Sequence, residues 1–211
     1  MIGVVPASPS PVHAVVFDVG RVLVEWDLRA LFAKLIADEE ELEWFLAHVV
    51  TEEWHFEHDR GRPLADMVPE RIALFPAYEA HIRAYATRFN ETIPGPVPGT
   101  TELVHRLRER DVPLFAITNF GHEFWAVYRP TAPVFDLFRD IVVSGTEKIA
   151  KPAPEIFERA ARRFGYRPKE LLFIDDNAAN IAASQALGWQ VHHFIDAETL
   201  AQDLQKRGLI G

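Results

Sequence analysis

The sequence predicts an α/β protein whose doubly wound parallel sheet is interrupted by a helical insertion. Its second half alternates short apolar strands with amphipathic helices, and a long helical stretch follows the first strand. Polar residues also recur where the predicted strands end. Alternating strands and helices imply parallel strands that helices cover on both faces. A chain of 211 residues is long enough for such a core and a smaller module.

The first half of the chain divides into a tail, one strand and a helical segment. Residues 1–11 hold three prolines and two serines, so we expect a mobile tail. Residues 13–17 are a short β-branched run bounded by turn residues, which predicts a strand. Apolar side chains then recur at helical spacing through residues 28–95. Three prolines and two glycines in residues 94–99 break the pattern and predict a hinge.

After this hinge the strand and helix patterns alternate strictly. We expect strands at residues 112–117, 141–143, 171–174 and 191–195. The helices between and around them are predicted at residues 101–110, 123–128, 153–164, 178–187 and 197–207. A glycine directly follows three of these helices, as helix C-termini favour. The predicted organisation is therefore a core of residues 12–27 and 96–211 and an inserted unit of residues 28–95.

Polar side chains follow four of the predicted elements. They are Asp18, Thr118 with Asn119, Lys151, and Asp175 with Asp176. The carboxyl ends of parallel strands meet at one edge of a sheet, where open α/β sheets bind ligands. We therefore expect these residues to face one crevice, with the helical insertion beside Asp18 acting as a lid. Its expected hinges are residues 23–28 and 94–99.

These segments resemble the motifs of the haloacid dehalogenase-like hydrolase superfamily. The matching segments are residues 17–23, 117–119, 151–157, and 173–177 with Asn180. The resemblance runs from about residue 13 to the end, and the insertion is similar to the family's small helical cap. Most members are magnesium-dependent phosphatases that act through an aspartyl-phosphate. The resemblance thus implies a Rossmann-like hydrolase core, a bound Mg²⁺ and a small phosphorylated substrate.

The resemblance also assigns roles to individual residues. Asp18 would be the nucleophile, and Thr118 and Lys151 would hold the transferred phosphoryl group. Asn119, Gly20 and Arg21 would contact the substrate. The expected Mg²⁺ ligands are the carboxylates of Asp18 and Asp176 and the carbonyl of Gly20, because Mg²⁺ prefers oxygen ligands. Asp175 and Asn180 would orient their neighbours.

One position departs from the family pattern. Typical phosphatases of the family carry a second Asp two residues after the nucleophile, and Gly20 stands there. A placed general acid is worth about 10²–10⁴-fold in rate. We therefore expect a slow phosphatase, a substrate with a good leaving group, or an acid from elsewhere. Residues able to replace it are Arg21, His55, His58 and Asp59.

Two other functions remain open at this point. A dehalogenase of the 2-haloacid type would use Asp18 to displace halide without metal, but its relatives lack an acidic pair such as Asp175 and Asp176. A non-catalytic phosphate-binding protein would explain Gly20. EDTA-insensitive halide release would favour the former, and binding without turnover the latter.

Composition narrows the partners. The net charge of −9 argues against general affinity for nucleic acid, which depends on Lys and Arg. No run approaches the ~20 apolar residues of a membrane span, and no cysteine is present. We expect a cytoplasmic enzyme with no membrane partner, and the aromatic residues of the insertion are compatible with a homodimer.

Overall fold

The computed structural model describes residues 11–211. The predicted mobile tail therefore lies outside the described residues, apart from Pro11. Five parallel strands form one sheet in the order β3-β2-β1-β4-β5. They are β1 (Ala14–Phe17), β2 (Leu114–Thr118), β3 (Asp140–Val143), β4 (Leu171–Asp175) and β5 (Gln190–His193). The predicted doubly wound parallel sheet is confirmed.

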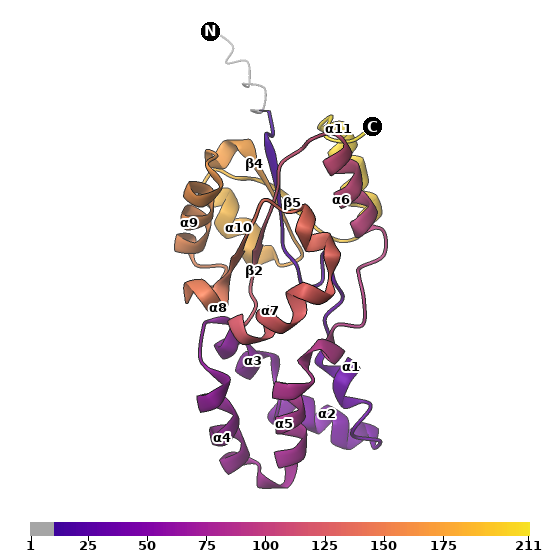
Figure 1. Ribbon diagram of the computed structural model, residues 1–211, viewed down its shortest axis with the longest axis vertical. Helices are drawn as coiled ribbons and strands as arrows, with labels where there is room; N and C mark the ends of the chain where they lie inside the picture. Colours follow the sequence, from indigo (N-terminus) through magenta and orange to yellow (C-terminus); the bar gives the residue numbers. More distant parts are fainter. Residues whose placement is uncertain (1–10) are drawn as a thin grey trace, which may run out of the picture.

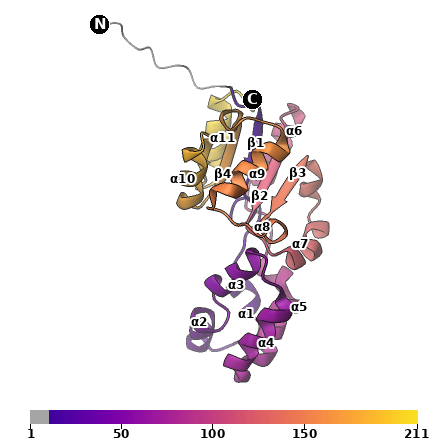
Figure 2. The same ribbon diagram turned by 90° about the vertical axis from the view of Figure 1, so that its left-hand side faces the viewer.

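Helices cover both faces of this sheet (Figures 1 and 2). The core helices are α6 (Thr100–Glu109), α7 (His122–Tyr128), α8 (Ser144–Glu147), α9 (Pro154–Phe164), α10 (Ala178–Ala186) and α11 (Ala197–Lys206). Side chains of β1 alternate between the faces, as the two-residue period of a strand requires. Ala14 and Val16 pack in the apolar cluster that includes α9, whereas Val15 and Phe17 pack with α6 and α11.

The helical insertion, residues 28–95, lies between β1 and α6 at one end of the sheet (Figure 1). Its α-helices are α1 (Leu28–Phe32), α2 (Glu39–His48), α3 (Glu52–Asp59), α4 (Leu64–Leu74) and α5 (Glu79–Thr87). Two short 3₁₀ helices, η1 (Pro76–Tyr78) and η2 (Phe89–Thr92), complete it. The side chains of Asp27, Asp38 and Thr51 accept hydrogen bonds from the first backbone N–H groups of α1, α2 and α3. These N-caps explain where the three helices begin.

The two segments that join the insertion to the core bond to each other. We call them the paired linkers, residues 23–27 and 92–97. The backbone N–H of Glu25 donates to the carbonyl of Gly95 at 2.8 Å, and that of Val97 donates to Leu23 at 3.0 Å. The backbone N–H of Asp27 donates to the carbonyl of Thr92 at 2.9 Å. The chain therefore enters and leaves the insertion side by side, through segments that overlap the predicted hinges at residues 23–28 and 94–99.

The segment between α7 and β3, for which the sequence analysis predicts no element, forms short helical turns. They are η3 (Arg129–Thr131) and η4 (Pro133–Leu137). Pro130 and Pro133 stand in their first turns, where a missing N–H leaves no hydrogen bond unmade. Phe135 is 1% exposed and anchors η4 in the core.

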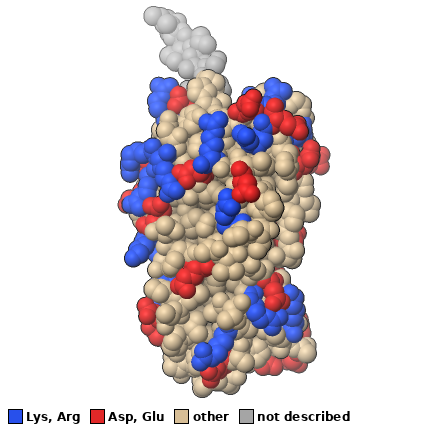
Figure 3. Space-filling model, viewed as in Figure 1, with Lys and Arg blue, Asp and Glu red and all other residues tan. Residues whose placement is uncertain are grey.

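Acidic and basic side chains are interspersed on the face shown in Figure 3. On α9, Arg159 pairs with Glu147, and Arg163 pairs with both Asp140 and Glu147. Among residues 11–211, no helix combines the length and apolarity that crossing a membrane requires.

Candidate active site

The predicted site residues gather at the carboxyl edge of the sheet, where the strand order reverses. The chain runs from β1 to β2 and β3 on one side, and β4 then pairs with β1 on the other. Phe17 is in register with Ile174, so Asp18, which follows β1, and Asp175, which ends β4, lie at the same level. Such reversal points are where open α/β sheets form ligand crevices.

Lys151 lies between two of the carboxylates. Its Nζ is 2.7 Å from Asp18 Oδ1 and 2.7 Å from Asp175 Oδ2. The side chain is 1% exposed, and a buried cation is stable only when it is paired in this way. Burial alone would lower the pKa of Lys151, but the charges of Asp175 and Asp18 raise it above its ordinary value. Lys151 is therefore a fixed positive charge at the sheet edge.

The charged form of Asp18 is destabilised by its surroundings. Burial raises its pKa from 3.8 to about 8, Lys151 opposes the rise, and the charge of Asp175 adds to it. Lys151 Nζ and the backbone N–H of Val19 both bond to Oδ1, each at 2.7 Å. Oδ2 has no partner among the described residues, so it is the oxygen available for a cation or for attack on a substrate.

Three carboxylates lie close enough to share a metal ion. Oxygens of Asp18, Asp175 and Asp176 all lie within 4.8 Å of one another. Asp175 is already occupied, because Lys151, the side-chain amide of Asn180 at 3.0 Å and the backbone N–H of Asn177 at 2.8 Å bond to it. Among the described residues, no side chain forms a hydrogen bond or ion pair with the Asp176 carboxylate. Burial raises the pKa of Asp176, and the charge of Asp175 adds to the rise. Asp18 and Asp176 thus fit a hard divalent cation, whereas Asp175 positions Lys151.

Asn119 clamps the lysine loop. Its side-chain amide donates to the carbonyl of Lys151 at 3.0 Å and accepts from the backbone N–H of Lys151 at 2.9 Å. Nothing in the sequence indicated this pairing, because residues 119 and 151 follow different strands. Thr118 ends β2 with its hydroxyl buried and without a partner in the described chain. Unlike Asn119, it does not belong to the wall of the cavity described next.

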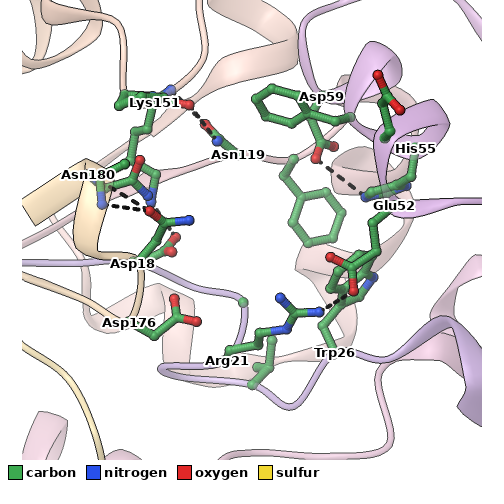
Figure 4. Close-up of a pocket in the computed structure, with 18 of the residues that line it drawn as sticks. Asp18, Arg21, Trp26, Glu52, His55, Asp59, Asn119, Lys151, Asp176 and Asn180 are labelled. Atoms are coloured by element: carbon green, nitrogen blue, oxygen red, sulfur yellow. Dashed lines mark hydrogen bonds and ion pairs between the residues drawn. The ribbon is translucent and has the colours of Figure 1, made fainter.

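A cavity of about 510 Å³ separates the sheet edge from the insertion. Asp18, Lys151 and Asp176 lie on one side of it, and residues of the insertion lie on the other (Figure 4). Arg21 bridges the two sides, because it pairs with Glu52 and its guanidinium lies 4.9 Å from the ring centre of Trp26. Sequence reasoning did not identify the apolar wall, formed by Val24, Phe56, Phe89, Ile93 and Phe120. Periodic apolar residues in helices indicate a core, and no pattern distinguishes those that face a cavity.

The family model described as haloacid dehalogenase-like hydrolase matches residues 12–188. The chain belongs to this family. It is 27% identical to a sesquiterpene phosphatase of Aspergillus oryzae over 204 residues, which cover 94% of this chain and 96% of that one. It is 25% identical over 152 residues to validoxylamine A 7'-phosphate phosphatase of Streptomyces hygroscopicus subsp. limoneus, covering 67% and 70% of the two chains.

Solved structures of the family share the fold. A Bacteroides thetaiotaomicron enzyme crystallised with magnesium and inorganic phosphate superposes with a TM-score of 0.67 at 23% identity. The match covers 88% of this chain and 95% of that one. The hydrolase described here therefore has the fold of an enzyme whose crystals hold both groups.

In this hydrolase, position 20 has room for a larger side chain. Gly20 lines the cavity, and a Cβ atom added to it would meet no atom within 4 Å. Its φ is outside the left-handed region, so the backbone does not require glycine there. The absence of a second aspartate is therefore not imposed by space.

The residues considered as replacements for that aspartate divide into two groups. Arg21, His55 and Asp59 line the cavity. His58 does not, because its Nδ1 donates to the carbonyl of Arg62 at 2.8 Å and its ring occupies the space above Gly121. Burial lowers the pKa of His58, so it is neutral at pH 7.

Proposed function

We propose that this hydrolase is a Mg²⁺-dependent phosphatase that cleaves a small phosphate monoester through an aspartyl-phosphate on Asp18. The observation that carries the proposal is the approach of Asp18 and Asp176, within 4.8 Å, beside the buried cation of Lys151. Two carboxylates and one ammonium around a cavity suit a phosphate dianion only when a further cation is present. Both curated relatives described above are phosphatases by name, which supports the same reaction.

The carboxylates of Asp18 and Asp176, with the carbonyl of Gly20, would hold the Mg²⁺. When bound, the ion neutralises negative charge on the phosphate and on the carboxylates. Lys151 contributes a second positive charge to the phosphoryl oxygens. Asp175 and Asn180 keep Lys151 in place. The arrangement lets a carboxylate approach an anionic phosphate.

Asp18 attacks phosphorus with a carboxylate oxygen, and the bond between phosphorus and the leaving alcohol oxygen breaks. The alcohol leaves with that electron pair and takes a proton from water, because Gly20 offers no acid. Water then attacks phosphorus, which releases inorganic phosphate and restores the Asp18 carboxylate. The backbone around Asn119 binds phosphoryl oxygens, and Arg21 and Gly20 border the ester. The Thr118 hydroxyl, which was expected to join them, is buried outside the cavity wall and does not reach the phosphate in this conformation.

The helical insertion acts in this proposal as a cap. Residues 28–95 cover the cavity, and residues 12–27 and 96–211 form the catalytic core. Bending at the paired linkers would close the cavity and exclude water while the ester is cleaved. Exclusion of water lowers the local dielectric constant and so strengthens the electrostatic interactions of Lys151 and the carboxylates.

The test is release of inorganic phosphate from a panel of sugar phosphates, nucleotides and an aryl phosphate, with Mg²⁺ and with EDTA. We expect metal-dependent release that Asp18→Asn abolishes. Glu40→Gln is the matched control, because Glu40 is exposed on α2 and is not part of the cavity wall. Full release by Asp18→Asn, or halide release from 2-chloropropionate in EDTA, would reject the proposal.

A further inference from the structure

The side of the cavity opposite the carboxylates is built mainly of apolar and aromatic side chains. The apolar wall described above consists of Val24, Phe56, Phe89, Ile93 and Phe120. Trp26 adds its indole ring, and Figure 4 shows it across the cavity from Asp18 and Asp176. The cavity volume of about 510 Å³ is that of a small-molecule site. Under the proposed function the phosphate lies against the carboxylates, so the alcohol of the ester faces this wall.

The polar side chains that border the apolar wall are already bonded to one another. Arg21 pairs with Glu52. His55 Nδ1 is 2.7 Å from the Tyr85 hydroxyl, and His55 Nε2 is 3.3 Å from Asp59 Oδ2. Both ring nitrogens of His55 are therefore occupied, and neither is available to a hydroxyl group of a ligand.

Other polar atoms on this side are sealed from the cavity or exposed to solvent. Asp59 Oδ1 and Trp26 Nε1 are buried and inaccessible, so neither can meet a ligand. Glu53 is exposed on α3. An alcohol with several hydroxyl groups would exchange its hydrogen bonds to water for contacts with ring faces, which costs free energy. An apolar alcohol would gain free energy from the same contacts.

The rings are fixed in place before a ligand arrives. Phe89 stacks on His55 with ring centres 5.4 Å apart and on Phe124 of α7 with ring centres 3.8 Å apart. Trp26 also stacks on His55, at 4.9 Å. A wall that is already ordered loses little conformational entropy when a ligand binds to it. Contact with an apolar alcohol therefore contributes to affinity almost undiminished.

We propose that the substrate is the monophosphate of an apolar alcohol, aromatic or aliphatic, whose hydrocarbon part lies against the apolar wall. This inference rests on the proposed function, because the phosphate site at Asp18 determines which end of the substrate faces the wall. Sugar phosphates, which carry a hydroxyl group on nearly every carbon, are poor substrates.

Four aryl phosphates with leaving phenols of nearly the same acidity test the inference. Their para substituents are methyl, propyl, butyl and 3-hydroxypropyl, and the last two have nearly the same shape. We expect each added methylene to raise kcat/KM roughly two- to fourfold. The hydroxypropyl ester should fall roughly tenfold or more below the butyl ester. Equal values for these two esters would overturn the inference.

The variant Phe56→Ala separates recognition from stability. We expect it to reduce the ratio of kcat/KM between the butyl and hydroxypropyl esters by roughly fivefold. Phe75→Ala is the matched control, because Phe75 is also a half-buried phenylalanine of the insertion with an arginine over its ring, but it is outside the cavity wall. It should leave the ratio unchanged. A loss of the same factor for both esters in Phe56→Ala would show a structural role and reject recognition.

Alkylphosphonates give a readout that does not need turnover, because their carbon–phosphorus bond is not cleaved. Calorimetric affinity for the parent chain with Mg²⁺ should rise from propyl- to butyl- to hexylphosphonate, with an increasingly negative heat-capacity change, and 5-hydroxypentylphosphonate should bind more weakly than its hexyl counterpart. Equal affinities, or no binding by any of the four, would reject this inference even if the chain is an active phosphatase. The expected order without phosphate release from any ester would reject the proposed function and uphold the apolar end of the site.

Discussion

Charged residues at the sheet edge lower the stability of the folded state. Asp18 is 8% exposed and shares its surroundings with Asp175 and Asp176. Lys151 compensates for part of the repulsion, but it is one cation among three carboxylates. Residues that oppose stability in this way are typical of functional sites. The cost has a measurable dependence on pH.

Asp18→Asn should stabilise the metal-free protein. The pKa of Asp18 is 3.8 when unperturbed and about 8 in the folded chain, so the folded state holds a proton that the unfolded state releases. This contribution to stability is therefore lost as pH rises from about 4 to about 8. We expect urea unfolding in EDTA to show that the variant gains about 1–3 kcal/mol near pH 8 and little near pH 5.

Magnesium should make the parent chain gain stability relative to Asp18→Asn. A ligand that binds only the folded state stabilises it by mass action, and the variant lacks one of the two carboxylates proposed to hold the ion. Excess Mg²⁺ should therefore raise the unfolding midpoint of the parent chain and leave that of Asp18→Asn almost unchanged. Equal shifts in both proteins would place the bound metal elsewhere.

Gly20→Asp should increase activity toward esters with poor leaving groups. The position borders the cavity, and a Cβ atom there would have no other atom within 4 Å, so the added carboxyl group fits. A placed general acid is worth about 10²–10⁴-fold, and we expect at least the lower end for an alkyl phosphate. Gly20→Asn is the control, because it fills the same space as Gly20→Asp without an acidic group. Phosphate release from alkyl and aryl esters by the two variants separates acid catalysis from the effect of a larger side chain. The same gain in both variants would contradict the prediction.

At the scale of elements, α3 of the insertion meets α8 of the core through one hydroxyl. Ser144 is fully buried, and its Oγ donates to the carbonyl of Asp59 while it accepts from the backbone N–H of Phe120. Because Asp59 ends α3, this hydroxyl fixes the helix that places Glu52, Glu53 and Asp59 on the cavity wall. It links the insertion to the strand-end loop after β2.

Ser144→Ala should weaken this link. Two buried backbone groups would lose their partner, which costs about 1–3 kcal/mol each when no replacement is found. We expect thermal unfolding at a lower temperature and a higher KM, since α3, which lines the cavity, would be held less firmly. Ser144→Thr keeps the hydroxyl and is the control, although its extra methyl group must be accommodated. An unchanged midpoint for Ser144→Ala would show that water replaces the hydroxyl.

At the scale of the whole molecule, the insertion and the core share one apolar cluster. It runs from Phe17 in the sheet to Phe45 and Tyr85 in the insertion. Phe124 of α7 stacks on Phe89 of η2 with ring centres 3.8 Å apart, and it lies 5.1 Å from Tyr85. Two parts joined by stacked rings and a common cluster should unfold together.

We expect a single calorimetric unfolding transition whose van't Hoff and calorimetric enthalpies agree. Phe124→Ala should lower stability by about 3–5 kcal/mol, because it removes a buried ring between the two parts. Phe115→Ala is the comparison. Phe115 lies on the opposite face of the sheet and packs in a second apolar cluster, which contains no residue of the insertion. Two separate transitions in the parent chain would contradict this coupling.

The sequence was sufficient to predict the sheet, the insertion and the meeting of polar residues at strand ends. Asp18, Lys151 and Asp176 could be placed together because parallel strands bring their carboxyl ends to one edge. The clamp between Asn119 and Lys151 could not, since it depends on how two loops pack. The apolar wall of the cavity could not be predicted either, because Phe89 shows the same helical spacing as residues of the interior. The local sequence pattern is enough to predict where a strand ends. Which side chains face a cavity depends on tertiary packing, which the local pattern does not show.

The paired linkers have a consequence for how such a molecule can be re-engineered. The backbone bonds between Glu25 and Gly95 and between Val97 and Leu23 bring the two crossing points together. A foreign helical unit whose ends lie equally close could be joined there without stretching the sheet, provided that it also covers the apolar surface that Phe124 presents to the insertion. The sheet edge would keep its reacting groups, and the graft would supply a new wall opposite them. Under the proposed function, the reacting groups and the wall that faces them would then come from two different sources within one chain.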